Sequence, residues 1–250
     1  SDQRMREIYE DYKFYDRNVC MYPAKDLIFF QADIHGNQLV TERWKVLRRM
    51  LEKVPMTIVT TLDALMEPQI PLERVKRDIV HISSSGQIKE RELAEKLTEL
   101  GYEKAYQVEA PGQFAMDSIR SFDVLSQRSI ENLSAVDIYP ATEMILTKDE
   151  RARGMRLISL EANKQEEALR GQGKIEEAAR LHRQIEELRE EVLELETKVN
   201  LESYVRYFYD GLGSFLGGFD KGETCIFMDE PARIGEHAEA VELEFRESMA

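Results

Sequence analysis

Residues 225–231 read Cys-Ile-Phe-Met-Asp-Glu-Pro, an apolar run that ends in two adjacent carboxylates. Many P-loop ATPases place a magnesium-directing carboxylate at the carboxyl end of a buried parallel strand, and an apolar run ending in Asp-Glu is typical of that strand. The pattern therefore predicts an apolar strand over residues 224–228, with Asp229 and Glu230 at its carboxyl end.

A strand of this kind works together with a loop of the form Gly-x-x-x-x-Gly-Lys-Ser/Thr, whose backbone N–H groups and lysine hold the phosphates. None of the 13 glycines is followed by Lys and then Ser or Thr. The glycines within 211–218 lack that continuation too, and we expect them to form a surface loop. We therefore predict an α/β fold with a degenerate, P-loop-NTPase-like parallel sheet. In it, Asp229 and Glu230 are a vestigial motor strand end without catalytic function.

Composition excludes several other classes of protein. The chain has 250 residues and a formal charge of −14, which argues against strong nucleic-acid binding because phosphate contacts need an excess of Lys and Arg. Its two cysteines, Cys20 and Cys225, lie far apart, and no Cys or His stands at metal-ligand spacing. These features indicate a reduced, cytosolic protein without a metal site. No apolar run approaches the roughly 18–20 residues of a membrane span. Both ends interrupt a pattern, so we expect a fragment of a longer protein.

Residues 1–64 alternate helix and strand patterns and predict the first part of the α/β domain. Helical spacing covers 8–15, and a short apolar strand covers 18–22. We expect a loop at 33–37 and then a helix that Thr41 caps. The uncharged, β-branched run at 56–61 has the composition of a buried parallel strand.

Residues 65–139 have a less regular pattern and predict a smaller, inserted α+β domain. An amphipathic helix is expected over 89–100, ended by Gly101, and a strand over 102–109. Residues 112–116 then continue directly into 117–123 without the turn residue that a hairpin would need.

Residues 140–250 predict the second part of the α/β domain, interrupted by a long helical hairpin. An a/d heptad seam is formed by Ala178, Leu181, Ile185, Leu188, Val192, Leu195 and Val199. A weaker seam precedes it, and a glycine turn lies between the two. We expect an antiparallel hairpin of helices 148–170 and 174–207, with a two-chain coiled coil as the alternative. A last helix is expected over about 235–249.

Three motifs resemble the N-terminal, UvrB-homology region of bacterial transcription-repair coupling factor (Mfd). They are Tyr22–Asp26 followed by Asp33–Asn37, then Phe122–Ser129, and then Phe227–Arg233. The resemblance implies a UvrB-like fold, a motor-like domain that has lost its ATP-binding loop and carries an inserted domain. It also implies that the inserted domain recruits UvrA to stalled RNA polymerase. RNA polymerase and DNA, with the ATP and Mg of the motor, would belong to downstream domains.

The resemblance also predicts where UvrA binds. In the family, a sequence like residues 112–116 continues into Arg-Gly-Gly and further strands before an Asp-Ser-Ile-Arg stretch. The residues that contact UvrA lie in that piece, which is missing here between Met116 and Asp117. The framing residues that remain at the edge of the predicted docking surface are Gln113, Phe114, Ile119 and Arg120.

These expectations combine into a non-catalytic, cytoplasmic module of nucleotide-excision repair that uses no cofactor and binds UvrA through residues 65–139. Two alternatives of other classes remain open. One is an active DNA-dependent ATPase or helicase fragment, whose turnover would depend on Glu230. The other is a coiled-coil interaction arm built on the helical hairpin.

Overall fold

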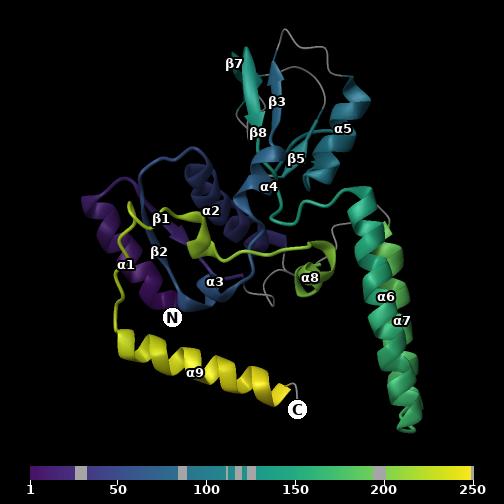
Figure 1. Ribbon diagram of the computed structural model, residues 1–250. Helices are drawn as coiled ribbons and strands as arrows, with labels where there is room; N and C mark the ends of the chain where they lie inside the picture. The colour runs from purple at the N-terminus through teal and green to yellow at the C-terminus, as the bar shows by residue number, and fades with distance from the viewer. Residues whose placement is uncertain are drawn as a thin grey trace. The chain divides into compact units, whose positions relative to one another are not determined.

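The computed structural model describes residues 1–25, 33–83, 89–110, 112–115, 120–122, 128–193 and 201–248 (Figure 1). The chain divides into two compact units, and both are discontinuous in sequence. Unit 1 comprises Ser1–Ile28, Glu42–Gln69 and Gly213–Ala250, and unit 2 comprises Phe29–Thr41 and Ile70–Leu212. Among the described residues, no helix is both long enough and apolar enough to span a membrane.

A parallel βαβ arrangement forms the centre of unit 1. Its elements are α1 (Asp2–Tyr15), β1 (Val19–Tyr22), α2 (Asp33–Leu51) and β2 (Thr57–Thr60). β1 and β2 pair in parallel, with Val19 opposite Thr57 and Tyr22 opposite Thr60. The two predicted strands are therefore present, and α2 supplies the crossover that parallel neighbours require.

The start of α2 differs from the sequence-based expectation. The helix begins at Asp33, so residues 33–37 are helical and not a loop, and Thr41 lies inside the helix and does not cap it. A threonine marks a helix start only where the preceding backbone leaves the helical region, because helix propagation continues through an interior threonine at little cost.

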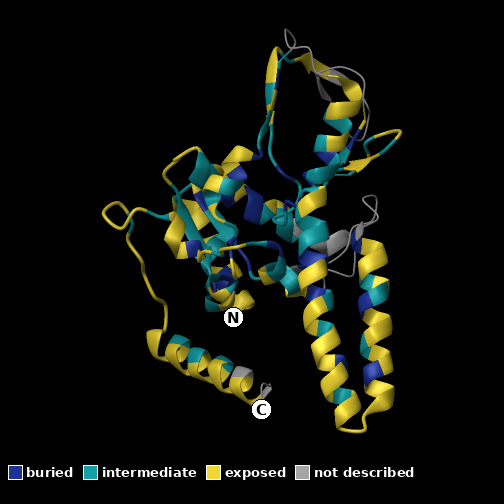
Figure 2. Cartoon of the chain, turned by 45° about the vertical axis from the view of Figure 1, so that its right-hand side comes forward, coloured by how far each residue is buried: buried dark blue, intermediate teal, exposed yellow. Residues whose placement is uncertain are grey.

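The chain returns to unit 1 through η3 (Phe215–Gly218) and ends in α9 (Pro231–Ser248). Residues 224–228, which lie between them, form no strand, so the predicted apolar strand is wrong. Ile226, Phe227 and Met228 are 63%, 91% and 65% exposed, and Figure 2 shows the approach to α9 as exposed. An apolar run becomes a strand only where a neighbouring chain segment supplies backbone hydrogen-bond partners. No described strand pairs with residues 224–228.

Unit 2 contains a small α+β part. Its elements are α4 (Leu72–Arg77), β3 (Val80–Ser83), α5 (Glu90–Glu99), β4 (Glu103–Lys104), β5 (Gln113–Phe114), β6 (Arg120–Phe122), β7 (Ser129–Asn132) and β8 (Ala135–Ile138). β3–β8 and β6–β7 are antiparallel pairs, whereas β4–β5 is parallel. The strand predicted over 102–109 is limited to β4, and the junction of residues 116 and 117 lies outside the described residues.

Gly101 ends the amphipathic helix of this part, as the sequence predicts. Its φ is +86°, and a Cβ at this position would lie 2.6 Å from Cγ2 of Thr142. Both the left-handed backbone and the close approach therefore require glycine. The helix end is fixed next to the segment that follows β8, since the N–H of Ala141 donates to the carbonyl of Leu100 at 2.8 Å.

Two long helices, α6 (Lys148–Gly171) and α7 (Ile175–Leu193), lie side by side in unit 2 and reverse direction at residues 172–174 (Figures 1 and 2). Gly173 has a φ of +80°, which allows the tight reversal. The core they share contains Leu146, Met155, Ile158, Ile185, Val192, Leu201 and Phe208. Of the predicted heptad residues, Ile185 and Val192 belong to this core and Leu181 and Leu188 pack against it, whereas Leu195 and Val199 lie outside the described residues.

The second long helix does not reach residue 207 as expected. Leu201 is not helical, and η2 (Glu202–Tyr204) and α8 (Val205–Phe208) form separate short helices. Residues 194–200 lie outside the described residues. Phe208 is fully buried against α6, where a Cβ at Gly154 would lie 2.1 Å from its Cδ1. This packing places α8 against α6.

Candidate functional site

Asp229 and Glu230 lie exposed immediately before α9. Oδ2 of Asp229 accepts a hydrogen bond from Nε of Arg4 at 2.9 Å. Glu230 has a φ of +54°, and its carbonyl accepts the N–H groups of Arg233 and Ile234. Its Oε2 also accepts a hydrogen bond from Nη1 of Arg233 at 2.7 Å. Asp229 thus binds Arg4 of α1, and Glu230 binds Arg233 of α9. No group of three His, Cys, Asp or Glu in the described ranges could hold a metal ion.

The predicted framing residues of the docking surface lie in the α+β part of unit 2. Gln113 and Phe114 form β5, and Phe114 is buried. Oε1 of Gln113 accepts the backbone N–H groups of Glu109 and Ala110 at 2.9 and 3.1 Å, so it closes the loop before β5. Arg120 begins β6 opposite Asn132, and Ile119 lies outside the described residues.

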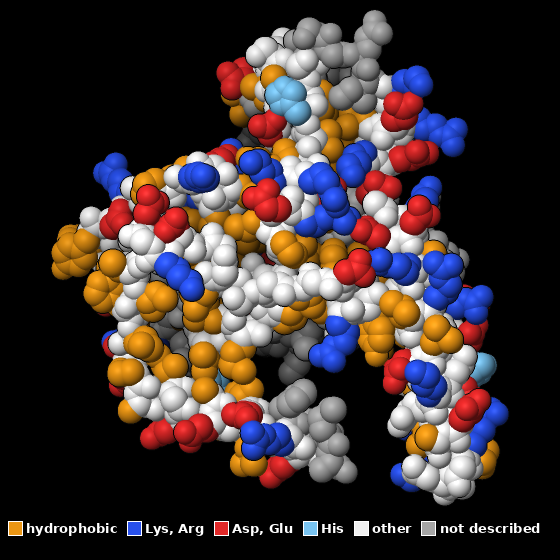
Figure 3. Space-filling view, viewed as in Figure 1, with side chains coloured by type: hydrophobic (Ala, Val, Ile, Leu, Met, Phe, Trp, Pro, Cys, Tyr) orange, Lys and Arg blue, Asp and Glu red, His pale blue; other side chains and the backbone are white. Residues whose placement is uncertain are grey.

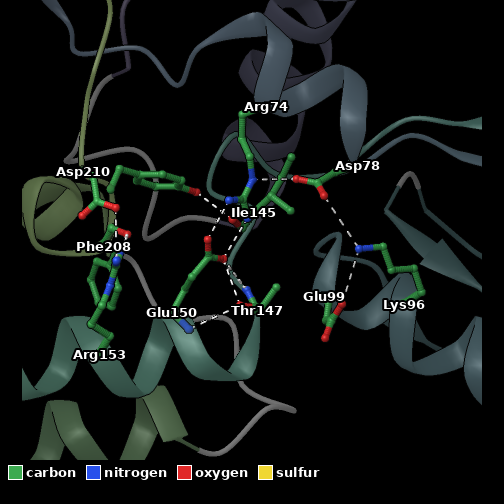
Figure 4. A network of polar contacts seen from close by, with 11 residues as sticks. Arg74, Asp78, Lys96, Glu99, Ile145, Thr147, Glu150, Arg153, Phe208 and Asp210 are labelled. Carbon is green, nitrogen blue, oxygen red and sulfur yellow. Dashed lines mark hydrogen bonds and ion pairs between the residues drawn. The ribbon is translucent and has the colours of Figure 1, made fainter.

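A polar network that the sequence did not predict connects the α+β part of unit 2 to α6 (Figure 4). At its centre, the guanidinium of Arg74 in α4 meets the carboxylate of Glu150 in α6 through two parallel hydrogen bonds. Nη1 donates to Oε1 at 2.6 Å, and Nη2 donates to Oε2 at 2.8 Å. Nε of Arg74 donates to Oδ2 of Asp78 at 2.9 Å. This forked geometry is the strong, orientation-specific form of an arginine–carboxylate pair.

The network extends in both directions from this pair. Oδ1 of Asp78 lies 3.9 Å from Nζ of Lys96 in α5, which also approaches Glu99 at 3.5 Å. On the other side, Oε2 of Glu150 accepts the backbone N–H of Thr147 at 2.9 Å, and the Thr147 hydroxyl accepts the N–H of Glu150. Glu150 therefore closes the capping box of α6 and binds α4 at the same time.

A second set of contacts fixes the segment after α8 to α6. Arg153 donates to the carbonyl of Phe208 at 3.0 Å and to Asp210 at 3.1 Å. The Tyr209 hydroxyl donates to the carbonyl of Ile145 at 2.8 Å. The start of α6 is therefore held both by the α+β part and by the chain that follows the helical pair.

The electrostatics of the network suit it to positioning. Burial by itself raises the pKa of Glu150, but the hydrogen bonds from Arg74 and Thr147 outweigh it and lower the pKa to about 2. The hydrogen bond to Glu150 raises the pKa of Arg74 in spite of the opposing effect of burial. Burial raises the pKa of Tyr209. A carboxylate of such low pKa is a poor proton acceptor at neutral pH, so the pair holds a geometry rather than moving protons.

The sequence carried only a partial signal for this network. Thr147 and Glu150 stand at capping-box spacing, which marks a helix start. Arg74 and Glu150 are 76 residues apart, and their pairing follows no local pattern.

No family model matches the chain. It is 30% identical over 263 residues to the transcription-repair-coupling factor of Bacillus subtilis (strain 168), a match that covers 92% of the chain and 21% of that relative. It is 26% and 27% identical to UvrABC system protein B of Pseudothermotoga lettingae and of Thermotoga maritima, over 90% of the chain and 38% of each relative. Since both kinds of relative match nearly the whole chain, the predicted resemblance to the UvrB-homology region of transcription-repair coupling factor is confirmed.

Proposed function

We propose that the chain is a non-catalytic module of nucleotide-excision repair that recruits UvrA through residues 65–139. The observation that carries the proposal is the combination of two facts. The chain matches both a transcription-repair-coupling factor and UvrB proteins over at least 90% of its length, and none of its 13 glycines begins the Gly-Lys-Ser/Thr end of a phosphate-binding loop. Binding of RNA polymerase and DNA by a longer protein belongs to the same proposal.

The same reading treats unit 1 as a degenerate P-loop-type domain. Its parallel β1–α2–β2 arrangement supports this interpretation, because nucleotide-binding α/β domains are built from such units. Asp229 and Glu230 would then be remnants of a motor. Their hydrogen bonds to Arg4 and Arg233 agree with a structural rather than a catalytic role.

The α+β part of unit 2 has features that suit a docking surface. Tyr106 is fully exposed, and Ile130 of β7 is 69% exposed. Exposed aromatic and aliphatic side chains are the anchors that carry most binding energy in protein interfaces. The Arg74–Glu150 pair holds this part against α6, so a partner would meet a surface whose orientation is already set, which lowers the entropic cost of binding.

The alignment with the B. subtilis relative also supports a missing segment. Because 92% of 250 residues is 230, the 263 aligned residues include more than 30 that this chain does not match. The expected site of the gap is the junction of Met116 and Asp117.

Binding to purified UvrA tests the proposal directly. We expect binding by a version of the chain that carries the relative's extra residues between positions 116 and 117, and weaker binding without them. Tyr106→Ala should weaken binding about tenfold or more if Tyr106 is an anchor. The matched control is Phe14→Ala in unit 1, which removes another strongly exposed aromatic side chain (86%) and should leave binding unchanged. A folded, complete version that does not bind UvrA contradicts the proposal.

An ATPase assay separates this function from the motor alternative. We expect no ATP turnover by the chain, with or without DNA. Turnover that disappears in Glu230→Gln would establish the ATPase reading instead.

A second candidate function, an interaction arm, rests on the surface of the helical pair. Figure 3 shows hydrophobic side chains among the charged ones along α6 and α7. Leu157 and Leu160 of α6 and Ile175 of α7 are 45%, 58% and 60% exposed. The interaction-arm function would be favoured by two results together. The double variant Leu157→Ser and Leu160→Ser would lose UvrA binding, and Tyr106→Ala would have no effect on it.

A further inference from the structure

Arg43 of α2 is fully buried in unit 1. Nη1 donates to the carbonyl of Pro23 at 2.6 Å and lies 2.9 Å from Oε2 of Glu67. Nη2 donates to the hydroxyl of Tyr22 at 2.6 Å, and the guanidinium carbon lies 4.1 Å from the centre of a Tyr22 ring. The planar guanidinium thus contacts a carbonyl, a carboxylate, a hydroxyl and an aromatic face, which are partners that suit its shape and charge.

The guanidinium lies at a particular place in the fold. Tyr22 is the last residue of β1, and Thr60, the last residue of β2, donates its hydroxyl to the Tyr22 carbonyl at 2.7 Å. Open α/β sheets bind their ligands just outside the carboxyl ends of parallel strands. In unit 1 this position is taken by the chain's own side chain, reached from the crossover helix.

The same cluster joins the three sequence stretches that make up unit 1. Arg43 and Tyr22 come from the second and first stretches, and Phe215 of the third stacks on the Tyr22 ring with centroids 3.9 Å apart and an interplanar angle of 19°. The side chain of Gln69 donates to the Tyr22 hydroxyl. The backbone of Gln69 exchanges two hydrogen bonds with Gly213, at 2.9 and 2.7 Å. The chain leaves unit 1 after Gln69 and returns at Gly213, so the cluster closes the base of the insertion.

We propose that Arg43 acts as a built-in ligand of unit 1. Its guanidinium occupies the carboxyl edge of the β1–β2 pair as a bound planar cation would, and unit 1 closes around it. The position is selective for a guanidinium, because a compact ammonium cannot reach the carbonyl, the carboxylate and the hydroxyl together. This proposal does not depend on UvrA recruitment.

Chemical rescue in the full chain tests the proposal. Trp44 is the only tryptophan, follows Arg43 in the sequence and is buried, so its emission reports on this region. Arg43→Gly should lower the Tm by roughly 10 °C, because it removes a fully buried guanidinium together with its contacts to Pro23, Tyr22 and Glu67. Millimolar guanidinium or methylguanidinium, far below denaturing levels, should restore part of the Tm and the Trp44 emission. Tetramethylammonium and sodium at equal ionic strength should not.

Matched variants make each outcome decisive. Arg48→Gly, on the exposed side of the same helix, loses the same helix propensity and should show no rescue. If Arg43→Gly does not fold, Arg43→Lys and Arg43→Met are compared instead, and we expect Lys to lie well below wild type and Met below Lys. Equal rescue of both glycine variants, no rescue of Arg43→Gly, or wild-type stability in either Arg43→Lys or Arg43→Met overturns the proposal.

Discussion

Each unit contains an arginine–glutamate pair, and the two pairs differ in how far the arginine is removed from water. In unit 1, Arg43 is fully buried, while its partner Glu67 keeps 19% of its side chain exposed. In unit 2, Arg74 and Glu150 keep 18% and 20% exposed and make two parallel hydrogen bonds. The Arg43 side chain is therefore further removed from water than the Arg74 side chain. We therefore expect burial, more than the number of hydrogen bonds, to determine the cost of losing a partner.

The largest expected effect follows from removing the carboxylate of the buried pair. Glu67→Ala should lower the free energy of unfolding by about 3–5 kcal/mol, because it removes the carboxylate that lies 2.9 Å from the fully buried Arg43 guanidinium. Urea unfolding followed by Trp44 emission measures the change. Glu52→Ala, directly after the end of α2, is the control and should cost far less, because the Glu52 side chain is 37% exposed. Equal costs for the two variants would contradict the role given to burial.

A smaller effect is expected for the half-buried pair. Glu150→Gln should cost about 1.5–3 kcal/mol, because it replaces charge-assisted hydrogen bonds with neutral ones while keeping the shape of the side chain. Glu167→Gln, on an exposed position of α6, should change stability by less than about 0.5 kcal/mol. Unfolding of both variants in urea, followed by circular dichroism, gives the comparison. A cost for Glu150→Gln that exceeds the cost for Glu67→Ala would reverse the ranking of the two pairs.

The pH dependence of the same pair gives a third test. The pKa of Glu150 is lowered from 4.5 to about 2 in the folded chain, so its ionised form stabilises the fold above pH 4.5. That contribution should be lost as the pH falls from 4.5 toward 2, because the folded state then resists protonation while the unfolded state does not. The stability difference between wild type and Glu150→Gln should be constant from pH 8 to about pH 5 and shrink by pH 3. If the stability difference does not change over this pH range, the pairing with Arg74 does not lower the pKa of Glu150.

The smallest expected effect concerns the second attachment of α6. Tyr209→Phe removes the hydrogen bond to the carbonyl of Ile145 and should cost about 1 kcal/mol. Tyr207→Phe is the control, since its hydroxyl has no hydrogen bond to a described residue, and it should be neutral. Thermal unfolding of the two variants side by side decides whether this contact contributes.

Elements that depend on near neighbours in the sequence were predicted well. The apolar and β-branched runs at 18–22 and 56–61 became the parallel pair β1–β2, and Ile185 and Val192 of the heptad pattern lie in the core that α6 and α7 share. Glycine at position 101 ends α5 because its backbone is left-handed. In each case the residue pattern that marks the element lies within that element's own stretch of sequence.

Elements that need a distant partner were predicted poorly. Residues 224–228 have the composition of a strand but are exposed, because a strand also needs a neighbour that donates and accepts backbone hydrogen bonds. The second long helix was predicted to extend to residue 207, which is too far. The heptad pattern contains no sign that Phe208 packs against Gly154. Among the predicted docking residues, Gln113 and Phe114 have clear places in β5, whereas nothing in the sequence pointed to the Arg74–Glu150 pair.

The sequence by itself determined the fold class, the family resemblance and the absence of a phosphate-binding loop. These properties depend on residue order over short distances, where periodicity, turn residues and motifs are visible. Only the tertiary structure decided which charges meet. Arg43 faces Glu67 and Tyr22, and Arg74 faces Glu150, because the folded chain brings these residues together from separate elements, and a charge leaves water only where such a partner is already in place.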